Sequence, residues 1–311
     1  VNFTNYKVTP VHAVFDEARR LAGKLGLRVT GSELVGLIPR EALLMAGRHY
    51  LEKQGKSPGV PEEELVRVAV RSLGLNDVVP FEADKKIIEN QFREAGPALS
   101  ELTLRAFADE LSMDSPAPGG GSVAALCGAL SAALAAMVAN LTVGKKGYEA
   151  VGEEMAAAAV RAQGLKDALL EAVDRDTRAF NKVMEAFRLP KTTPEQAAEK
   201  ERAVEAANKE ATLVPLEVLE SSVVAVGLAR TAAAKGNRNS LSDAGVAGLA
   251  AQAAGEGAYY NVLINLGGIK DPVFTARVRR RAEKMKRDLD RVGKAVRALV
   301  LKSLSPTSGR T

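Results

Sequence analysis

The chain has 311 residues, of which 46% are hydrophobic but only 4% aromatic, and it has no tryptophan. This length allows two domains with separate cores, and aliphatic, alanine-dominated cores favour helices. The net charge of +5 is too slight to indicate a nucleic acid partner, although it suits an anionic small molecule. The single cysteine, Cys127, has no disulfide partner, and no signal peptide or membrane segment is apparent, so we expect a cytoplasmic protein.

Residues 1–90 mix strand and helix signals. Short strands are predicted at 1–6, 27–31 and 33–38, and helices are predicted to follow Pro10, Pro39 and Pro61. We therefore expect a small, partial α/β subdomain of ferredoxin-like type. A sheet this small leaves its edges unpaired unless further strands come from elsewhere.

Residues 91–101, with Gly96-Pro97 at their centre, are predicted to link this subdomain to an all-α helical bundle at 102–311. Thr193–Gln196 has the pattern of a capping box, and Pro215 is expected to kink or break its helix. Asp271-Pro272 is expected to begin the last helix. Its apolar positions follow a heptad: Phe274, Val278, Ala282, Met285, Leu289, Val292, Val296 and Leu299. The predicted fold class is therefore mainly α.

A glycine turn precedes the most apolar stretch of the chain. Gly119, Gly120, Gly121 and Ser122 lead directly into an alanine-rich run that ends near Val143. A helix that begins here directs free N–H groups and a partial positive charge at the turn, which is typical of a cradle for an anion or a carbonyl group. Alanine contributes little transfer energy, so the run is interpreted as the core of a bundle and not as a membrane span.

The predicted helical domain contains no histidine, which argues against a zinc site or a Cys-His nucleophile there. One carboxylate is conspicuous, because Asp176 shares a helix face with Val173 and Phe180. An ionised carboxylate on an apolar face is costly, so it is expected to be paired in a structural salt bridge, to be protonated, or to face a cleft. Asp174 lies on the other side of that helix and is expected to form an exposed pair with Arg178.

Other polar residues interrupt the later helices. Ser242 or Asp243 is placed to cap a helix, and Asn261 and Asn265 lie one turn apart on one face. From the residues alone, capping and interhelical hydrogen bonds are the favoured roles. The basic cluster at 279–287 is interpreted as a solvated helix face.

Four segments resemble, in order, the motifs of the cyclodeaminase/cyclohydrolase family. They are PAPGGGSVAALCGALSAALAAMVANLTVGKKGY, VDRDTRAFNKVMEAFRLPK, GNRNSLSDAGVA and AYYNVLINL, and the similarity covers about 101–303. The amino-terminal segments VNFTNYKVTPVHAVFDEARR and VTGSELVGLIPREALL are similar to the carboxyl-terminal lobe of glutamate formimidoyltransferases. The combination resembles the formimidoyltransferase-cyclodeaminase family, two-activity folate enzymes of histidine breakdown. The transferase's amino-terminal lobe, which bears its catalytic histidine, has no counterpart here. We therefore expect no transferase activity from this chain alone and assign no such role to His12 or His49.

The resemblance implies closure of 5-formimino-tetrahydrofolate to 5,10-methenyl-tetrahydrofolate with loss of ammonia. It identifies Asp176 as the catalytic acid and base, the residue already singled out by its helix face. The substrate-binding residues it implies are Gly119, Gly120, Gly121, Ser122, Lys145, Lys146, Asp243, Asn261 and Asn265. We expect the tetrahydrofolate derivative as substrate, no metal and no permanently bound cofactor, no nucleic acid or membrane partner, and a homodimer or larger homo-oligomer. The alternatives are a methenyltetrahydrofolate cyclohydrolase and a non-catalytic folate-binding subunit.

Overall fold

The computed structural model describes residues 1–92 and 98–304, which divide into two compact units. The first unit comprises residues 1–92 with 143–152, and the second comprises 98–142 with 153–304. Residues 93–97 of the predicted linker, including Gly96-Pro97, lie outside the described residues. The domain boundaries drawn from the sequence therefore stay a prediction.

The first unit is built from short helices around a small aliphatic core. Its helices are α1 (Val11–Lys24), α2 (Arg40–Lys53), α3 (Glu62–Ser72) and α4 (Ala83–Lys86), with 3-10 turns at Ile88–Phe92 and Glu149–Val151. The first three begin directly after Pro10, Pro39 and Pro61, as predicted. Leu43, Ala46 and Ala69 are completely buried where α2 packs on α3.

The strands predicted at 1–6, 27–31 and 33–38 are not formed. Within residues 1–92 the only β pairing is an isolated parallel bridge between Ile38 and Ile87. The N–H of Ile38 donates to the carbonyl of Lys86, and that of Ile88 donates to Ile38. The described chain supplies no further strand to extend this bridge, and an isolated pair of strands is at best marginally stable. The α/β character expected for residues 1–90 is therefore wrong, whereas the mainly α class of the chain is confirmed.

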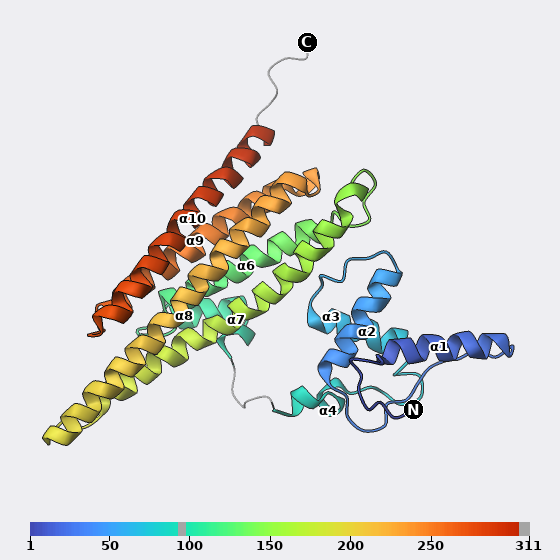
Figure 1. Ribbon diagram of the computed structural model, residues 1–311, viewed down its shortest axis with the longest axis horizontal. Coiled ribbons are helices and arrows are strands. Elements are labelled where there is room, and N and C mark those ends of the chain that lie inside the picture. Colours follow the sequence, from blue (N-terminus) through green and yellow to red (C-terminus); the bar gives the residue numbers. More distant parts are fainter. Residues whose placement is uncertain (93–97, 305–311) are drawn as a thin grey trace, which may run out of the picture. The chain divides into compact units, whose positions relative to one another are not determined.

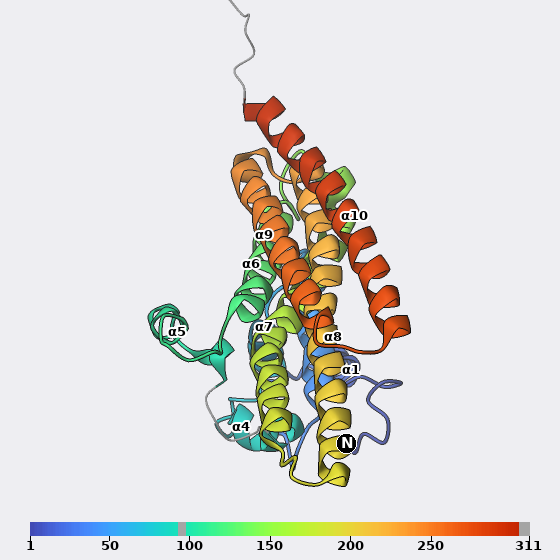
Figure 2. The same ribbon diagram turned by 90° about the vertical axis from the view of Figure 1, so that its left-hand side faces the viewer.

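The second unit is a bundle of long helices that run side by side (Figures 1 and 2). Its elements are 3-10 turns at Leu99–Glu101 and Arg238–Ser240 with helices α5 (Leu104–Leu111), α6 (Gly120–Asn140), α7 (Gly152–Arg188), α8 (Pro194–Lys235), α9 (Leu241–Leu266) and α10 (Pro272–Leu304). The capping box predicted for α8 is present, because Thr193 accepts from the N–H of Gln196 and the Gln196 side chain accepts in return.

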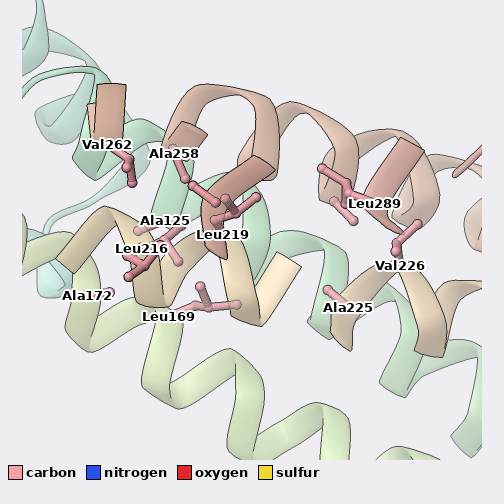
Figure 3. Packing of buried hydrophobic residues seen from close by; sticks show 14 of the residues in the cluster. Ala125, Leu169, Ala172, Leu216, Leu219, Ala225, Val226, Ala258, Val262 and Leu289 are labelled. Carbon is pink, nitrogen blue, oxygen red and sulfur yellow. The ribbon is translucent and has the colours of Figure 1, made fainter. Parts of the chain in front are cut away.

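The core of the bundle is aliphatic and contains many alanines, as the composition indicated. Leu169 of α7, Leu219 of α8 and Leu289 of α10 are among its largest buried side chains (Figure 3). Small side chains fill most of the positions between them, and these allow helix backbones to approach closely.

Helices α6 and α9 run antiparallel and pack closely together. A Cβ added at Gly257 would lie 3.2 Å from the Cβ of Ala124, and the Ser131 hydroxyl donates to the carbonyl of Ala247 at 2.7 Å. The carboxyl-terminal half of α9 therefore lies beside the amino-terminal turns of α6.

Helix α8 continues through Pro215, so the expectation of a break at this proline is wrong. Proline lacks an N–H, which leaves the carbonyl four residues earlier, at Ala211, without its usual helical donor. The Nδ2 of Asn265 donates to that carbonyl at 2.9 Å. A side chain from α9 thus supplies the hydrogen bond that the proline removes.

The last helix begins and packs as predicted. The Asp271 carboxylate accepts from the N–H groups of Val273 and Phe274, both at 3.0 Å. The heptad positions Phe274, Val278, Ala282, Leu289 and Val296 are buried, and Met285 and Val292 pack against the same core. Near its end, Val300 is buried and the predicted Leu299 is only half-buried.

Two helices, α6 and α8, are long and apolar enough to cross a membrane by length and composition. Most of the most hydropathic segment of each is buried within the structure, 61% in α6 and 56% in α8. Core helices of soluble proteins pass the same test, so this is weak evidence for a membrane span. The burial agrees with the predicted place of α6 in the bundle core.

Gly255 tests the close packing of the core. An added Cβ there would overlap Leu289 Cδ2 and lie 3.1 Å from the Cβ of Ser222. We expect Gly255→Ala to lower the free energy of unfolding by about 1–3 kcal/mol. Gly164→Ala is the matched control, because Gly164 is exposed on α7 with nothing within 4 Å. It should raise stability by roughly 0.5–1 kcal/mol. Chemical denaturation measures both, and an unchanged Gly255→Ala protein would contradict the packing.

Candidate active site

Asp176 lies on α7 with its carboxylate against the first turn of α6. The Ser122 hydroxyl is 3.2 Å from Asp176 Oδ2, and the backbone N–H of Ser122 also donates to this carboxylate. The first N–H groups of a helix have no intrahelical acceptor and carry a partial positive charge. An N–H group of the turn that was predicted to receive a ligand's anion or carbonyl group therefore donates to a carboxylate of the protein itself, and the binding of a ligand there stays a prediction.

Two opposing effects act on the Asp176 carboxyl. Burial raises its pKa, because the charged form loses solvation, and the two hydrogen bonds from Ser122 lower it. The balance leaves the pKa above the ordinary aspartate value of 3.8. No salt bridge to Asp176 is present among the described residues, so the alternative of a structural ion pair is not supported.

At only one of the three positions in the turn do the surrounding atoms leave no room for a side chain. A Cβ added at Gly121 would overlap the Asp176 carboxylate. One added at Gly120 would lie 3.7 Å from Asn261 Nδ2, and one at Gly119 would lie 3.6 Å from the Pro116 carbonyl; both are ordinary contacts. The absence of a side chain at 121 thus makes room for the carboxylate.

Asn261 is brought to the site, and Asn265 has a structural role. The Nδ2 of Asn261 lies beside Gly120 and donates to the carbonyl of Gly257 at 2.8 Å. Its Oδ1 accepts no hydrogen bond that we find from the described residues. Asn265 is occupied by the Ala211 carbonyl, which agrees with the interhelical role that the residues alone favoured.

Asp243 is not assembled with Asp176 within one chain, and the two predicted lysines belong to the other compact unit. Asp243 lies in the first turn of α9, eighteen positions from Asn261, which is about 27 Å along the helix. Lys145, whose Nζ lies 6.0 Å from the ring centre of Tyr148, and the exposed Lys146 belong to the first unit. Their roles in substrate binding stay a prediction.

The prediction that Asp174 forms an exposed pair with Arg178 is wrong. Asp174 is buried, and its carboxylate accepts from the N–H of Leu99 and the hydroxyl of Ser100, both at 2.6 Å. It anchors the segment that precedes α5. Sequence spacing gave no sign of this role, because the donors lie about 75 positions earlier in the chain.

Thr177 is a neighbour that the sequence analysis missed. Its hydroxyl lies 3.4 Å from the Ser122 hydroxyl, so it borders the Asp176 hydrogen bonds without touching the carboxylate. Within residues 1–92 and 98–304 we find no group of three or more histidine, cysteine, aspartate or glutamate side chains arranged to hold a metal. The chemistry of the site therefore centres on one carboxyl group, one amide and a helix terminus.

Residues 103–284 match the family model described as formiminotransferase-cyclodeaminase, and residues 1–93 match that of the formiminotransferase domain. The chain belongs to the formiminotransferase-cyclodeaminase family. The resemblance of residues 1–90 to formimidoyltransferases is thereby confirmed.

Three similar proteins illustrate the family. The rat (Rattus norvegicus) formimidoyltransferase-cyclodeaminase is 39% identical over 305 residues, which covers 97% of this chain and 56% of that protein. A methenyltetrahydrofolate cyclohydrolase of Methylorubrum extorquens is 41% identical over 172 residues, 55% of this chain and 83% of that protein. The crystal structure of the Thermotoga maritima formiminotetrahydrofolate cyclodeaminase superposes with a TM-score of 0.60 at 30% identity, covering 67% of this chain and all of that one. The chain spans just over half the length of the two-activity relatives.

Substitution of the glycine turn tests the placement of the carboxylate. We expect Gly121→Ala to displace the Asp176 carboxylate from the first turn of α6, because the new methyl group and the carboxylate cannot occupy the same space. Gly120→Ala is the control and should leave the carboxylate in place, since its methyl group meets only the Asn261 amide at van der Waals distance. Crystal structures of the two variants decide the matter. An Asp176 carboxylate unmoved by Gly121→Ala would refute this packing.

Proposed function

We propose that this chain is a formimidoyltetrahydrofolate cyclodeaminase, an ammonia-lyase of one-carbon metabolism and histidine degradation. The observation that carries the proposal is the Asp176 carboxyl, half-buried at the start of α6 with a raised pKa. The proposal is supported by the 30% identical cyclodeaminase fold, which spans the whole of that relative. A cytoplasmic location belongs to the same proposal.

The reaction needs one proton to move between two nitrogens. The formimino group reacts in its protonated form, –CH=NH2+. N10 of the folate attacks its carbon, the C=N bond becomes a single bond to an amino group, and a bond forms between the carbon and N10. The Asp176 carboxylate takes the proton from N10 and then delivers it to the amino group. The bond between carbon and that amino group breaks, ammonia leaves, and the methenyl cation remains. A carboxyl group whose pKa is raised by burial holds this proton more readily than an ordinary aspartate does.

Asn261, Lys145 and Lys146 have the chemistry to bind parts of the substrate. Asn261 borders the first turn of α6, and its Oδ1 is an acceptor for N10–H or for the departing amine. Lys145 and Lys146 are cations suited to the carboxylates of the folate tail. Asn265 is withdrawn from this set, because its amide donates to Ala211.

The second candidate function is a methenyltetrahydrofolate cyclohydrolase, favoured by the 41% identity to the Methylorubrum extorquens enzyme of that name. Here water attacks the methenyl carbon, and the same carboxyl takes a proton from it. The proton passes to N5 as the bond between that carbon and N5 breaks, the remaining hydroxyl proton goes to solvent, and a formyl group is left on N10. Purified protein should be offered both folates while methenyl-folate absorbance and ammonia release are followed. Ammonia release coupled to methenyl formation supports the cyclodeaminase. Hydrolysis of the methenyl compound alone supports the cyclohydrolase, and binding without turnover supports a folate-binding subunit.

We further propose that the protein acts as a homodimer. Helices α6 and α9 carry a row of large apolar side chains on the side that faces away from the core. This outer α6–α9 face consists of Leu130, Met137, Leu141, Val246, Leu249, Tyr260 and Ile264, which are 37–75% exposed. Exposed large apolar side chains along two packed helices are typical of an interface, and two-fold dimers are the commonest homo-oligomers.

A two-fold dimer across this face would also give Asp243 a place near an active site. Within one chain Asp243 and Asn261 lie at opposite ends of α9, about 27 Å apart. A two-fold axis near the middle of the outer α6–α9 face brings the Asp243 end of one copy to the Asp176 end of the other. The site would then combine Asp176 and Asn261 of one subunit with Asp243 of its partner.

Asp176→Asn should abolish ring closure without lowering stability. General acid–base transfer is worth about 10²–10⁴ in rate, and asparagine carries no proton between the two nitrogens. Because the folded-state pKa of Asp176 is raised, its ionised form opposes folding at pH values above that pKa. The Asn variant should therefore melt at or above the wild-type temperature at pH 7. The difference should vanish as the pH falls below the ordinary aspartate range, where both states of Asp176 are protonated.

Glu171→Gln is the matched control for charge, because Glu171 is exposed on the same helix. Asp174→Asn is unsuitable, since it disturbs the buried bonds to Leu99 and Ser100. Steady-state rates and thermal melts at several pH values provide the readout. A well-folded Asp176→Asn protein with normal turnover contradicts the mechanism.

Mixed dimers test the shared site. We expect Asp176→Asn and Asp243→Asn to be inactive alone. When the two variants are mixed in equal amounts and their subunits reassociate at random, half of the dimers contain one subunit of each variant. Each such mixed dimer contains one site with both aspartates intact. Activity should therefore return to about a quarter of the wild-type value. Leu130→Glu should prevent both dimerisation and this recovery, whereas Leu213→Glu, an exposed leucine on α8, should not. Light scattering and rates report the result, and an active monomer excludes the arrangement.

A further inference from the structure

The Ser122 hydroxyl lies 3.2 Å from Asp176 Oδ2, and the Ser122 side chain has no exposed surface. Its predicted role as a substrate contact stays a prediction, and the burial of its hydroxyl indicates a role that needs no contact with a ligand. Its oxygen lies within hydrogen-bonding reach of three acceptors, which are Asp176 Oδ2 at 3.2 Å, the Val173 carbonyl at 3.0 Å and the Thr177 hydroxyl at 3.4 Å.

A serine hydroxyl carries one proton and rotates freely about its C–O bond. It therefore donates to one of these acceptors at a time. The ionised carboxylate is the strongest acceptor of the three, because hydrogen bonds to charged groups are about twice as strong as neutral ones. Once the carboxyl is protonated, this advantage is lost, and the carbonyl of Val173 becomes a comparable partner.

We infer that Ser122 is a positioning residue whose rotating hydroxyl sets the proton affinity of Asp176. It donates to the carboxylate while that group is ionised and turns to the Val173 carbonyl when the carboxyl is protonated. Burial favours the protonated carboxyl, and a carboxyl that stays protonated is a poor base. The Ser122 hydroxyl opposes this effect and keeps both protonation states accessible, which a group that first accepts and then donates a proton requires.

Charged groups on the surrounding helices form pairs or hydrogen bonds with residues other than Asp176. On α7, Arg175 pairs with Glu217 of α8 at 2.8 Å, and Asp174 accepts from Leu99 and Ser100. The first turn of α6 contains no charged side chain, and Asn261 of α9 is neutral. Among the described residues, burial and the hydrogen bonds from Ser122 are the effects that act on the Asp176 pKa. The hydroxyl is thus the side-chain contact through which the site adjusts this pKa.

The experiment titrates the carboxyl group directly. Protein labelled with ¹³C at the aspartate carboxyl carbons is followed by NMR against pH, and the Asp176 signal is identified by its loss in Asp176→Asn. In Ser122→Ala the pKa of Asp176 should rise by about one to two units. Ser131→Ala is the matched control, because Ser131 is equally buried on the same helix but donates to the Ala247 carbonyl. It should leave the Asp176 titration unchanged.

Ser122→Cys, which keeps a rotating but weaker donor, should give an intermediate rise and serves if the alanine variant does not fold. The pH–rate profile of either variant should move upward with the carboxyl titration. An Asp176 pKa equal to that of the wild type in the folded variant overturns the inference. The role of this proton rests on the proposed function, but the titration needs no substrate. Loss of the proposed activity and failure of the Ser122 role are therefore separate results.

Discussion

The site depends on one contact, that of the Asp176 carboxylate with the first turn of α6. A buried carboxylate is unfavourable, and the free N–H groups of a helix terminus are equally in need of acceptors. The N–H of Ser122 donates to the Asp176 carboxylate, so both groups gain a hydrogen-bond partner. The absence of a side chain at Gly121 leaves room for this contact. The same contact fixes α6 against α7 at the level of the site. Burial raises the pKa of Asp176 and the hydrogen bonds from Ser122 lower it, and opposing effects of this kind suit a group that both accepts and donates a proton.

Small side chains hold the remaining elements around this contact. The packing of Ala124 against Gly257, and of Gly255 under Leu289, sets the spacing of α9 relative to its neighbours. This spacing carries Asn261 to the start of α6. The bundle therefore positions an amide and a carboxyl from separate helices without using a loop at the site, and rigid elements hold such groups more accurately than loops do.

Features with local causes were predictable from the sequence, and features with distant partners were not. The capping box at Thr193, the start of α10 at Asp271 and the heptad of α10 follow from neighbours within a few residues, and all are present. Asp176 was found because it interrupts an apolar face. Asp174 was misjudged because its donors, Leu99 and Ser100, lie far away in sequence. The strands expected in residues 1–90 failed because strand propensity does not supply a partner strand.

The hydrogen bond between Asn265 and the Ala211 carbonyl has a consequence for how this sequence can change. Pro215 leaves the Ala211 carbonyl without its helical N–H donor, and the Asn265 amide of another helix donates to that carbonyl instead. A lineage that replaces Pro215 restores the backbone N–H that donates to the Ala211 carbonyl. The side chain at position 265 is then no longer needed as a donor, so apolar residues become acceptable there. A lineage that keeps Pro215 but loses the Asn265 amide leaves the Ala211 carbonyl without a hydrogen-bond donor inside the bundle. The two positions are therefore expected to vary together, with the proline changing first.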